Sequence, residues 1–197
     1  MFVDSIVVTM DDASISLSLR IGKDSRATSA MPTHPRPSTN YAPKRQRSDV
    51  PSRNFVAISL VNRVLDRLWV GSADDLSGQI PFASLGFSAI LDLRDGDNRV
   101  DFPGVEVLRV SNRDGDPWSV NQVHTVLDFI WSRLARGCVL VACAAGRSRS
   151  VSVITTYLVR CGWGLPEALV HVRACRPEAS PSPSTLDSMV NCLAVSR

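Results

Sequence analysis

The chain has 197 residues and a mass of 21.5 kDa, and 44% of its residues are hydrophobic, so it can form one domain with a real core plus extensions. Its net charge of only +3 gives no electrostatic reason to expect a nucleic-acid partner. The five cysteines form no Cys-x-x-Cys pair and the three histidines lack metal-ligand spacing, so we expect no metal, no cofactor and a reducing intracellular location, cytoplasmic or nuclear. No apolar run is long enough to span a membrane and the N-terminus lacks a signal-peptide pattern, so no membrane association is expected.

The first part of the chain differs in composition from the rest. Alternating apolar and polar residues at Ile15–Ile21 predict a strand, which is either an added edge strand or part of an unstructured tail. Residues 23–53 contain five prolines among many serines, threonines and arginines, a composition typical of a disordered linker. We therefore predict a largely disordered N-terminal extension at 1–54 and one folded domain at 55–197.

Two features of the linker leave alternatives open. Met31 is a second candidate for the start of the chain. The basic cluster Lys44–Arg47 is typical of a solvated tail, with nuclear import or binding to an anionic surface as the alternatives.

Short stretches rich in Val, Ile and Leu predict the strands of the folded domain. The predicted strands lie at 56–60, 67–71, 89–93, 105–110 and 138–142. A turn at 62–66 separates the first two strands, and the mixed polar and apolar segment 74–85 predicts one or two short helices.

Apolar residues at helical spacing predict four longer helices. The first follows Ser119 as its N-cap and ends at Gly137. The other three are predicted at about 149–161, at about 166–175 with Pro166 as the first residue, and at about 184–194 with Ser184 as the N-cap. Alternating strands and helices indicate an α/β fold with a central mixed, mostly parallel sheet of about five strands flanked by helices.

The stretch Val139–Ser150 carries the chemistry. An apolar strand leads into Cys143, a short loop follows, and Arg149 begins a helix. Such a loop directs amide N–H groups and the positive end of the helix dipole at one point, which suits a phosphate and favours the nucleophilic thiolate form of a cysteine. The arginine adds a planar fork that matches two phosphate oxygens. The alternative is a buried structural cysteine beside an arginine on a solvated helix face, but the crowding of two arginines and two serines in one turn favours the anion site.

This stretch resembles the signature loop of the protein tyrosine phosphatase superfamily in its dual-specificity branch, which reads His-Cys-x-x-Gly-x-Ser-Arg-Ser. Five residues match this pattern: Cys143, Gly146, Ser148, Arg149 and Ser150. The resemblance extends over about residues 57–195. It implies the cysteine-phosphatase fold and an enzyme that hydrolyses phosphotyrosine and phosphoserine or phosphothreonine, with a phosphoprotein as its partner.

Each residue of the stretch then has an expected role. Cys143 attacks phosphorus and forms a phosphocysteine intermediate, and Arg149 holds the negative charge of the transition state without a metal. The resemblance implies that Ser150 donates a hydrogen bond to the cysteine sulfur and eases its departure. The expected phosphate-binding loop consists of Ala144, Ala145, Gly146, Arg147 and Ser148.

The leaving oxygen needs a proton, which a carboxyl group on another loop can supply. We expect Asp114 in this role, because the family's acid likewise follows a strand and precedes the helix that leads to the signature strand. Asp116 is the alternative, and both are also ordinary turn residues.

The sequence departs from the family pattern at two positions. Ala142 stands where the family has a histidine that braces the loop and helps to keep the cysteine ionised, and Ser182 stands where the family has a bracing asparagine. We therefore expect a looser loop, a less fully ionised Cys143, and activity that is weaker or has an altered pH profile. Arg147 adds a cation that either favours acidic flanking residues or faces water.

Two other functions stay open at this point. A pseudophosphatase would bind phosphoproteins with little turnover, and a phosphatase of this type can act on a non-protein phosphate such as an RNA 5′ end or a phosphoinositide. The oligomeric state is left open by the sequence.

Overall fold

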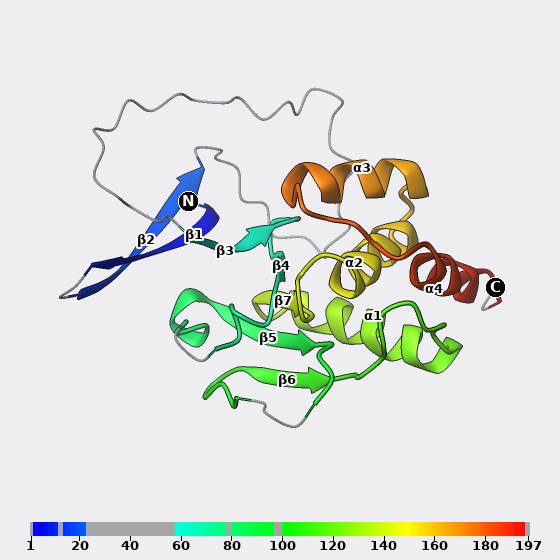
Figure 1. The fold of residues 1–197 in the computed structure, drawn as a ribbon, viewed down its shortest axis with the longest axis horizontal. Coiled ribbons are helices and arrows are strands. Elements are labelled where there is room, and N and C mark those ends of the chain that lie inside the picture. Colours follow the sequence, from blue (N-terminus) through cyan, green and yellow to red (C-terminus); the bar gives the residue numbers. More distant parts are fainter. Residues whose placement is uncertain (1, 12–13, 23–57, 78–79, 97–99, 196–197) are drawn as a thin grey trace.

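The structure is a computed structural model that describes residues 2–11, 14–22, 58–77, 80–96 and 100–195 (Figure 1). Its strands lie side by side in one sheet of order β2-β1-β3-β4-β7-β5-β6. The strands are β1 (Phe2–Asp11), β2 (Ser14–Gly22), β3 (Ile58–Arg63), β4 (Leu68–Gly71), β5 (Phe87–Asp92), β6 (Glu106–Arg109) and β7 (Cys138–Ala142).

Five of these strands, β3 to β7, confirm the predicted sheet. The pairs β4–β7, β7–β5 and β5–β6 are parallel and the pair β3–β4 is antiparallel, so the sheet is mixed and mostly parallel. Strands β1 and β2 form an antiparallel hairpin that pairs through β1 with β3, so that β2 lies at the edge of the sheet. The alternating run in the N-terminal extension is therefore an added edge strand rather than a tail. The predicted linker at 23–53 lies outside the described residues and stays a prediction.

The helices follow the predicted order, with small shifts at their ends. They are α1 (Val120–Leu134), α2 (Arg149–Arg160), α3 (Leu165–Cys175) and α4 (Pro183–Val195), and the segment before β5 contains a single 3₁₀ turn, η1 (Ala83–Leu85), among its described residues. Ser119 caps α1 in a capping box with Gln122, as its position predicted. Among the described helices, none has both the length and the apolar character that a membrane crossing demands.

The start of α4 differs from the prediction. Ser184 is not its N-cap, because the helix begins one residue earlier at Pro183. The carbonyl of Ser182 accepts the first helical hydrogen bond, from the amide of Leu186 over 3.0 Å. Proline fits the first helical position because its φ is already helical and its missing N–H is not needed there.

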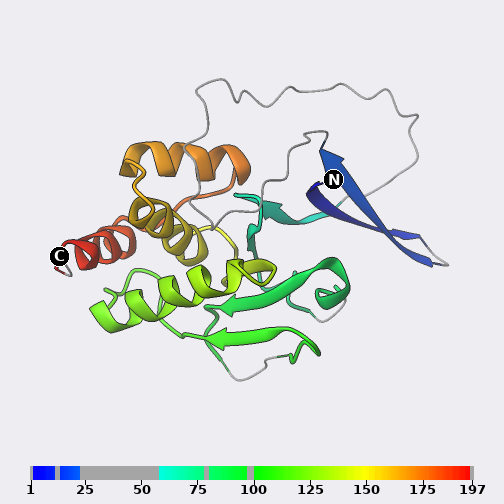
Figure 2. The ribbon, with the colours of Figure 1, turned by 180° about the vertical axis from the view of Figure 1, so that it is seen from behind.

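The two faces of the sheet pack against different hydrophobic cores. Residues Leu68, Val70, Leu91 and Val141 pack in one core with α1 to α4, as the helices gather on that face (Figures 1 and 2). The residues that alternate with these along each strand face a second core, in which four aromatic side chains pack around η1. This period of two follows from the pleat of a strand, and it buries the central strands on both sides.

The register of the parallel strands determines where a site can form. Gly71 at the end of β4 lies opposite Ala142 at the end of β7, which in turn lies opposite Asp92 at the end of β5. Asp92 lies opposite Arg109 at the end of β6. The loops that leave these four strands therefore converge at one edge of the sheet, where ligands bind in α/β folds.

Candidate active site

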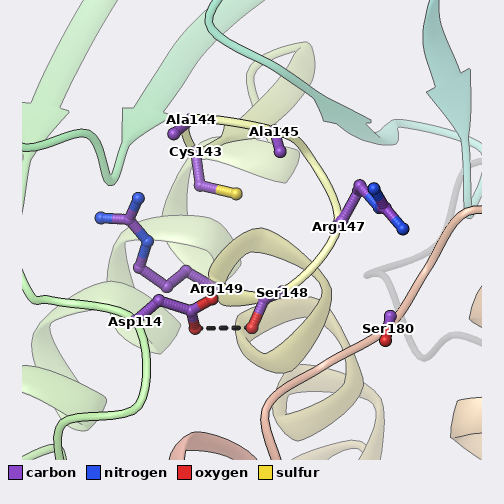
Figure 3. A pocket seen from close by; sticks show the side chains of 8 residues that line it. All are labelled: Asp114, Cys143, Ala144, Ala145, Arg147, Ser148, Arg149 and Ser180. Carbon is purple, nitrogen blue, oxygen red and sulfur yellow. Dashed lines mark hydrogen bonds between the residues drawn. The ribbon is translucent and has the colours of Figure 1, made fainter.

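The loop that leaves β7 carries Cys143 into a pocket of about 280 Å³. The residue is only 2% exposed, and in Figure 3 its Sγ points into the hollow that the loop encloses. Ser150, in the first turn of α2, places its Oγ 3.2 Å from this sulfur, within hydrogen-bonding distance. The pocket is lined by Asp114, Cys143, Ala144, Ala145, Arg147, Ser148, Arg149 and Ser180.

The loop curls tightly because of Gly146, whose φ of 64° lies in the left-handed region. A Cβ at this position would lie 2.7 Å from the carbonyl oxygen of Gly71 and 2.8 Å from Nη2 of Arg176, so only glycine fits. The N–H groups of residues 144–148 donate no hydrogen bond within the described part of the chain. Together with the N-terminus of α2, they leave a set of donors suited to an oxyanion.

Arg149 is buried beside the thiol and is held by one of its nitrogens. Nη1 donates to the carbonyl oxygens of Leu93 and Asn112, over 2.8 and 2.9 Å, and lies 2.9 Å from Oδ2 of Asp95. Among the described residues, neither Nε nor Nη2 of this arginine has a hydrogen-bond partner. These two donors form one edge of the guanidinium, the arrangement that binds two oxygens of a phosphate.

The structure brings Asp114, and not Asp116, to the pocket. Oδ1 of Asp114 accepts a hydrogen bond of 2.6 Å from the hydroxyl of Ser148, a residue of the phosphate-binding loop (Figure 3). Both carboxyl groups are exposed, but Asp116 does not line the pocket. The loop that carries Asp114 is tied to α4, since the amide of Gly115 donates to Oγ1 of Thr185 over 3.0 Å.

Comparison with known proteins identifies the family of this chain. The profile of the dual specificity phosphatase catalytic domain matches residues 68–192. The chain belongs to the dual-specificity phosphatase family. Human dual specificity phosphatase 28 is 34% identical over 125 residues, which cover 61% of this chain and 70% of that protein. Its crystal structure has a TM-score of 0.61 with 29% identity and covers 70% of this chain and 95% of that one.

A second relative has a different name. Mouse phosphatidylglycerophosphatase and protein-tyrosine phosphatase 1 is 39% identical over 88 residues, which cover 43% of this chain and 45% of that protein. The matched segment is thus less than half of either chain.

The two departures from the dual-specificity pattern are visible in the structure. Ala142 is fully buried in the aromatic core behind the sheet, and its carbonyl oxygen accepts the amide of Leu93 over 2.8 Å. Ser182 contacts the loop through its backbone, because its amide donates to Oγ of Ser148 over 2.9 Å. A backbone donor therefore makes one contact with the loop at a position where the family pattern has an asparagine.

Arg147 lies at the rim of the pocket. Its Nε donates to the carbonyl oxygen of Glu178 over 3.3 Å, and in Figure 3 its guanidinium points away from the thiol of Cys143. This residue therefore borders the phosphate-binding loop without facing the sulfur.

Three charged residues of the site were missed by the sequence analysis. Asp95 pairs with Arg149, and Asp75 and Arg176 lie behind the loop. Asp95 could have been predicted, because it follows β5, the strand next to β7 in the sheet.

No group of three or more metal-ligating side chains occurs among the described residues.

Proposed function

We propose that this dual-specificity phosphatase hydrolyses phosphotyrosine and phosphoserine or phosphothreonine in proteins through a phosphocysteine intermediate on Cys143. The observation that carries the proposal is the convergence of a thiol, an arginine edge and a carboxyl group on one pocket. The thiol comes from the end of β7, the arginine from α2 and the carboxyl group from the loop after β6.

In the first step the thiolate of Cys143 attacks phosphorus, so that an S–P bond forms and the bond from phosphorus to the substrate oxygen breaks. The loop amides and the free edge of Arg149 stabilise the negative charge on the phosphoryl oxygens. Asp114 gives its proton to the leaving oxygen, and the product is an alcohol or a phenol.

In the second step a water molecule attacks the phosphocysteine. Asp114, now a carboxylate, takes a proton from this water, and the S–P bond breaks to release phosphate and restore the thiolate. The hydroxyl of Ser150, 3.2 Å from the sulfur, donates a hydrogen bond to the departing thiolate.

The expected partner is a phosphoprotein. The wall of the pocket includes the exposed small side chains of Ala144 and Ala145, so that bulky groups beside the phosphate meet little obstruction. Such a rim suits both aryl and alkyl phosphates, in keeping with dual specificity.

The test is turnover of a small aryl phosphate by the wild type, Cys143→Ser and Asp114→Ala, with Asp116→Ala as the matched control. We expect no turnover by Cys143→Ser, a loss of about 10²–10³-fold in kcat for Asp114→Ala, and near-wild-type rates for Asp116→Ala. Absence of wild-type turnover at every pH would instead support a phospho-binding pseudophosphatase.

A lipid phosphate is the second candidate substrate. It is favoured by the 39% identity to a relative named as a phosphatidylglycerophosphatase. Phosphopeptides and phosphatidylglycerophosphate vesicles assayed side by side separate the two, and a kcat/KM at least tenfold higher for the lipid would replace the protein substrate in the proposal.

A further inference from the structure

We propose that Asp75 and Arg176 are positioning residues that brace the phosphate-binding loop from behind, at a site where Ala142 provides no bracing side chain. The proposal rests on the proposed function only for its kinetic readout. Its structural content is that two buried charged side chains, separated by about a hundred residues in the chain, fix the two halves of one loop.

The first half of the loop is held by the backbone of residues 71–73. The carbonyl oxygen of Gly71 accepts the amide of Cys143 over 3.4 Å, and the amide of Ala73 donates to the carbonyl oxygen of Ala144 over 3.0 Å. These two hydrogen bonds connect the end of β4 directly to the nucleophile and its neighbour. The position of this short segment therefore sets the position of the thiol.

Asp75 fixes the residue between those two hydrogen bonds. Its Oδ2 accepts both the amide of Ser72, over 2.5 Å, and the hydroxyl of Ser72, over 2.9 Å. The carboxyl group is buried, with 1% of the residue exposed. A buried carboxyl group that accepts two hydrogen bonds from one residue holds that residue in a single arrangement.

The second half of the loop rests on Arg176. Its Nη2 lies 2.8 Å from the place of a Cβ on Gly146, so the guanidinium is packed directly against the loop backbone. Its Nη1 donates to Oδ1 of Asn62 on β3 over 2.7 Å, and its Nε lies 3.5 Å from Oε2 of Glu178. Four residues further on, the amide of Ser180 donates to the carbonyl oxygen of Arg147 over 2.8 Å.

The two side chains also act on each other electrostatically. Burial raises the pKa of Asp75 to about 6, while the hydrogen bonds from Ser72 and the positive charge of Arg176 oppose that rise and Asp74 adds to it. A carboxylate behind an anion-binding loop would weaken phosphate binding if it were unpaired. Arg176 offsets that charge, so the brace does not reduce the positive potential at the pocket.

The experiment measures binding of tungstate, a tetrahedral oxyanion, together with the rate of Cys143 alkylation against pH, kcat, KM and the melting temperature. The variants are Asp75→Leu, which removes the oxygen that accepts both hydrogen bonds from Ser72, Asp75→Asn, which keeps an acceptor oxygen but loses the charge, and Ser72→Ala. Asp92→Asn is the control, because Asp92 is equally buried and its carboxylate is paired with Arg94 rather than with the loop.

The alkylation reports mainly on Cys143. Burial raises the pKa of Cys138, Cys161 and Cys175, so alkylation near neutral pH discriminates against these three thiols.

We expect tungstate affinity to fall about tenfold in Asp75→Leu and two- to threefold in Asp75→Asn and Ser72→Ala, with the Asp92→Asn control within twofold of the wild type. Arg176→Gln should weaken tungstate binding more than Asp75→Asn does, because it leaves Asp75 without its opposing charge. The double variant Asp75→Asn/Arg176→Gln should then bind tungstate better than Arg176→Gln alone.

Wild-type affinity for tungstate in folded Asp75→Asn, Ser72→Ala and Arg176→Gln would overturn the proposal, as would a loss in Asp92→Asn equal to that in Asp75→Asn. Failure of the proposed function has a different signature. A wild type that binds tungstate but hydrolyses no phosphate ester refutes the proposed turnover and leaves the brace testable by binding and alkylation.

Discussion

The hydroxyl of Ser148 donates a hydrogen bond to Oδ1 of Asp114 over 2.6 Å, and this contact joins the phosphate-binding loop to the loop that carries the proposed general acid. The same hydroxyl oxygen accepts the amide of Ser182 over 2.9 Å. Ser148 therefore connects three segments that are distant in the chain. Its contact with Asp114 places the carboxyl group at the wall of the pocket that contains the thiol.

We predict that Ser148→Ala lowers kcat about five- to tenfold and changes KM less, because the lost hydrogen bond positions the acid, at about 1–1.5 kcal/mol. The measurement is steady-state kinetics on two aryl phosphates whose leaving phenols differ in pKa. The loss should be smaller for the better leaving group, which needs the proton less. Ser132→Ala on the outer part of α1 is the control, and equal losses for the two substrates would contradict the assignment.

The tight curl of the loop gives a second prediction. Gly146→Ala should abolish turnover and weaken tungstate binding at least tenfold, because the new Cβ would meet the backbone oxygen of Gly71 at 2.7 Å and would also hold a φ of 64° that side chains disfavour. Gly162→Ala is the matched control, since its φ is 95° and nothing lies within 4 Å of its Cβ position.

The control separates the two causes of the loss. Gly162→Ala carries the cost of the backbone conformation, about 1 kcal/mol or more, without a clash near the pocket. It should therefore lower the melting temperature and leave tungstate binding unchanged. Retained binding in Gly146→Ala would show that the loop relaxes away from Gly71 without loss of its anion site.

The parts of the site that the sequence predicted depend on neighbours in the chain. The pattern from Cys143 to Ser150 is continuous, so the strand, the loop and the helix start could be predicted together. The position of Asp114 followed from chain order, because the loop between β6 and α1 is short and contains two acidic residues. The capping box of Ser119 is likewise encoded within four residues.

The missed parts depend on contacts between distant segments. Asp75 and Arg176 reach the same loop from positions about a hundred residues apart, and neither has a local pattern that predicts burial. The partner of β2 could not be chosen from an alternating run, because pairing with β1 and the attachment of that hairpin to β3 are set by register in three dimensions. Ser184 was predicted as the N-cap of α4, but the adjacent Pro183 is better suited to the first helical position, so the helix begins there.

The pH dependence of stability gives a third prediction. The pKa of Asp75 is raised by burial from 3.8 to about 6, so the folded chain binds a proton more tightly than the unfolded chain does. The stabilisation from this proton is complete below about pH 4 and is lost as the pH rises through 6. The change is at most about 3 kcal/mol, from a shift of about two pKa units.

Urea unfolding of the wild type and of Asp75→Asn at several pH values between 4 and 7 measures this contribution. The free energy of unfolding of the wild type, relative to that of the variant, should fall across this range because asparagine does not titrate. Parallel pH profiles for the two proteins would show that the Asp75 carboxyl group has the same proton affinity in the folded and the unfolded chain.

The last prediction concerns Ala142, which is fully buried beside Leu140 and Ile90 in the aromatic core. Ala142→His restores the residue of the family pattern but adds a ring to a packed site, so we expect the free energy of unfolding to fall by about 1–3 kcal/mol. If the imidazolium favours the thiolate of Cys143 as the family pattern implies, alkylation of that thiol should reach half its maximal rate about one pH unit lower. Ala142→Leu is the control, because it adds bulk without a titratable group. Equal alkylation profiles for the two variants would mean that a histidine at position 142 does not favour the thiolate of Cys143 in this chain. The loop would then be held by Asp75 and Arg176 without help from that position.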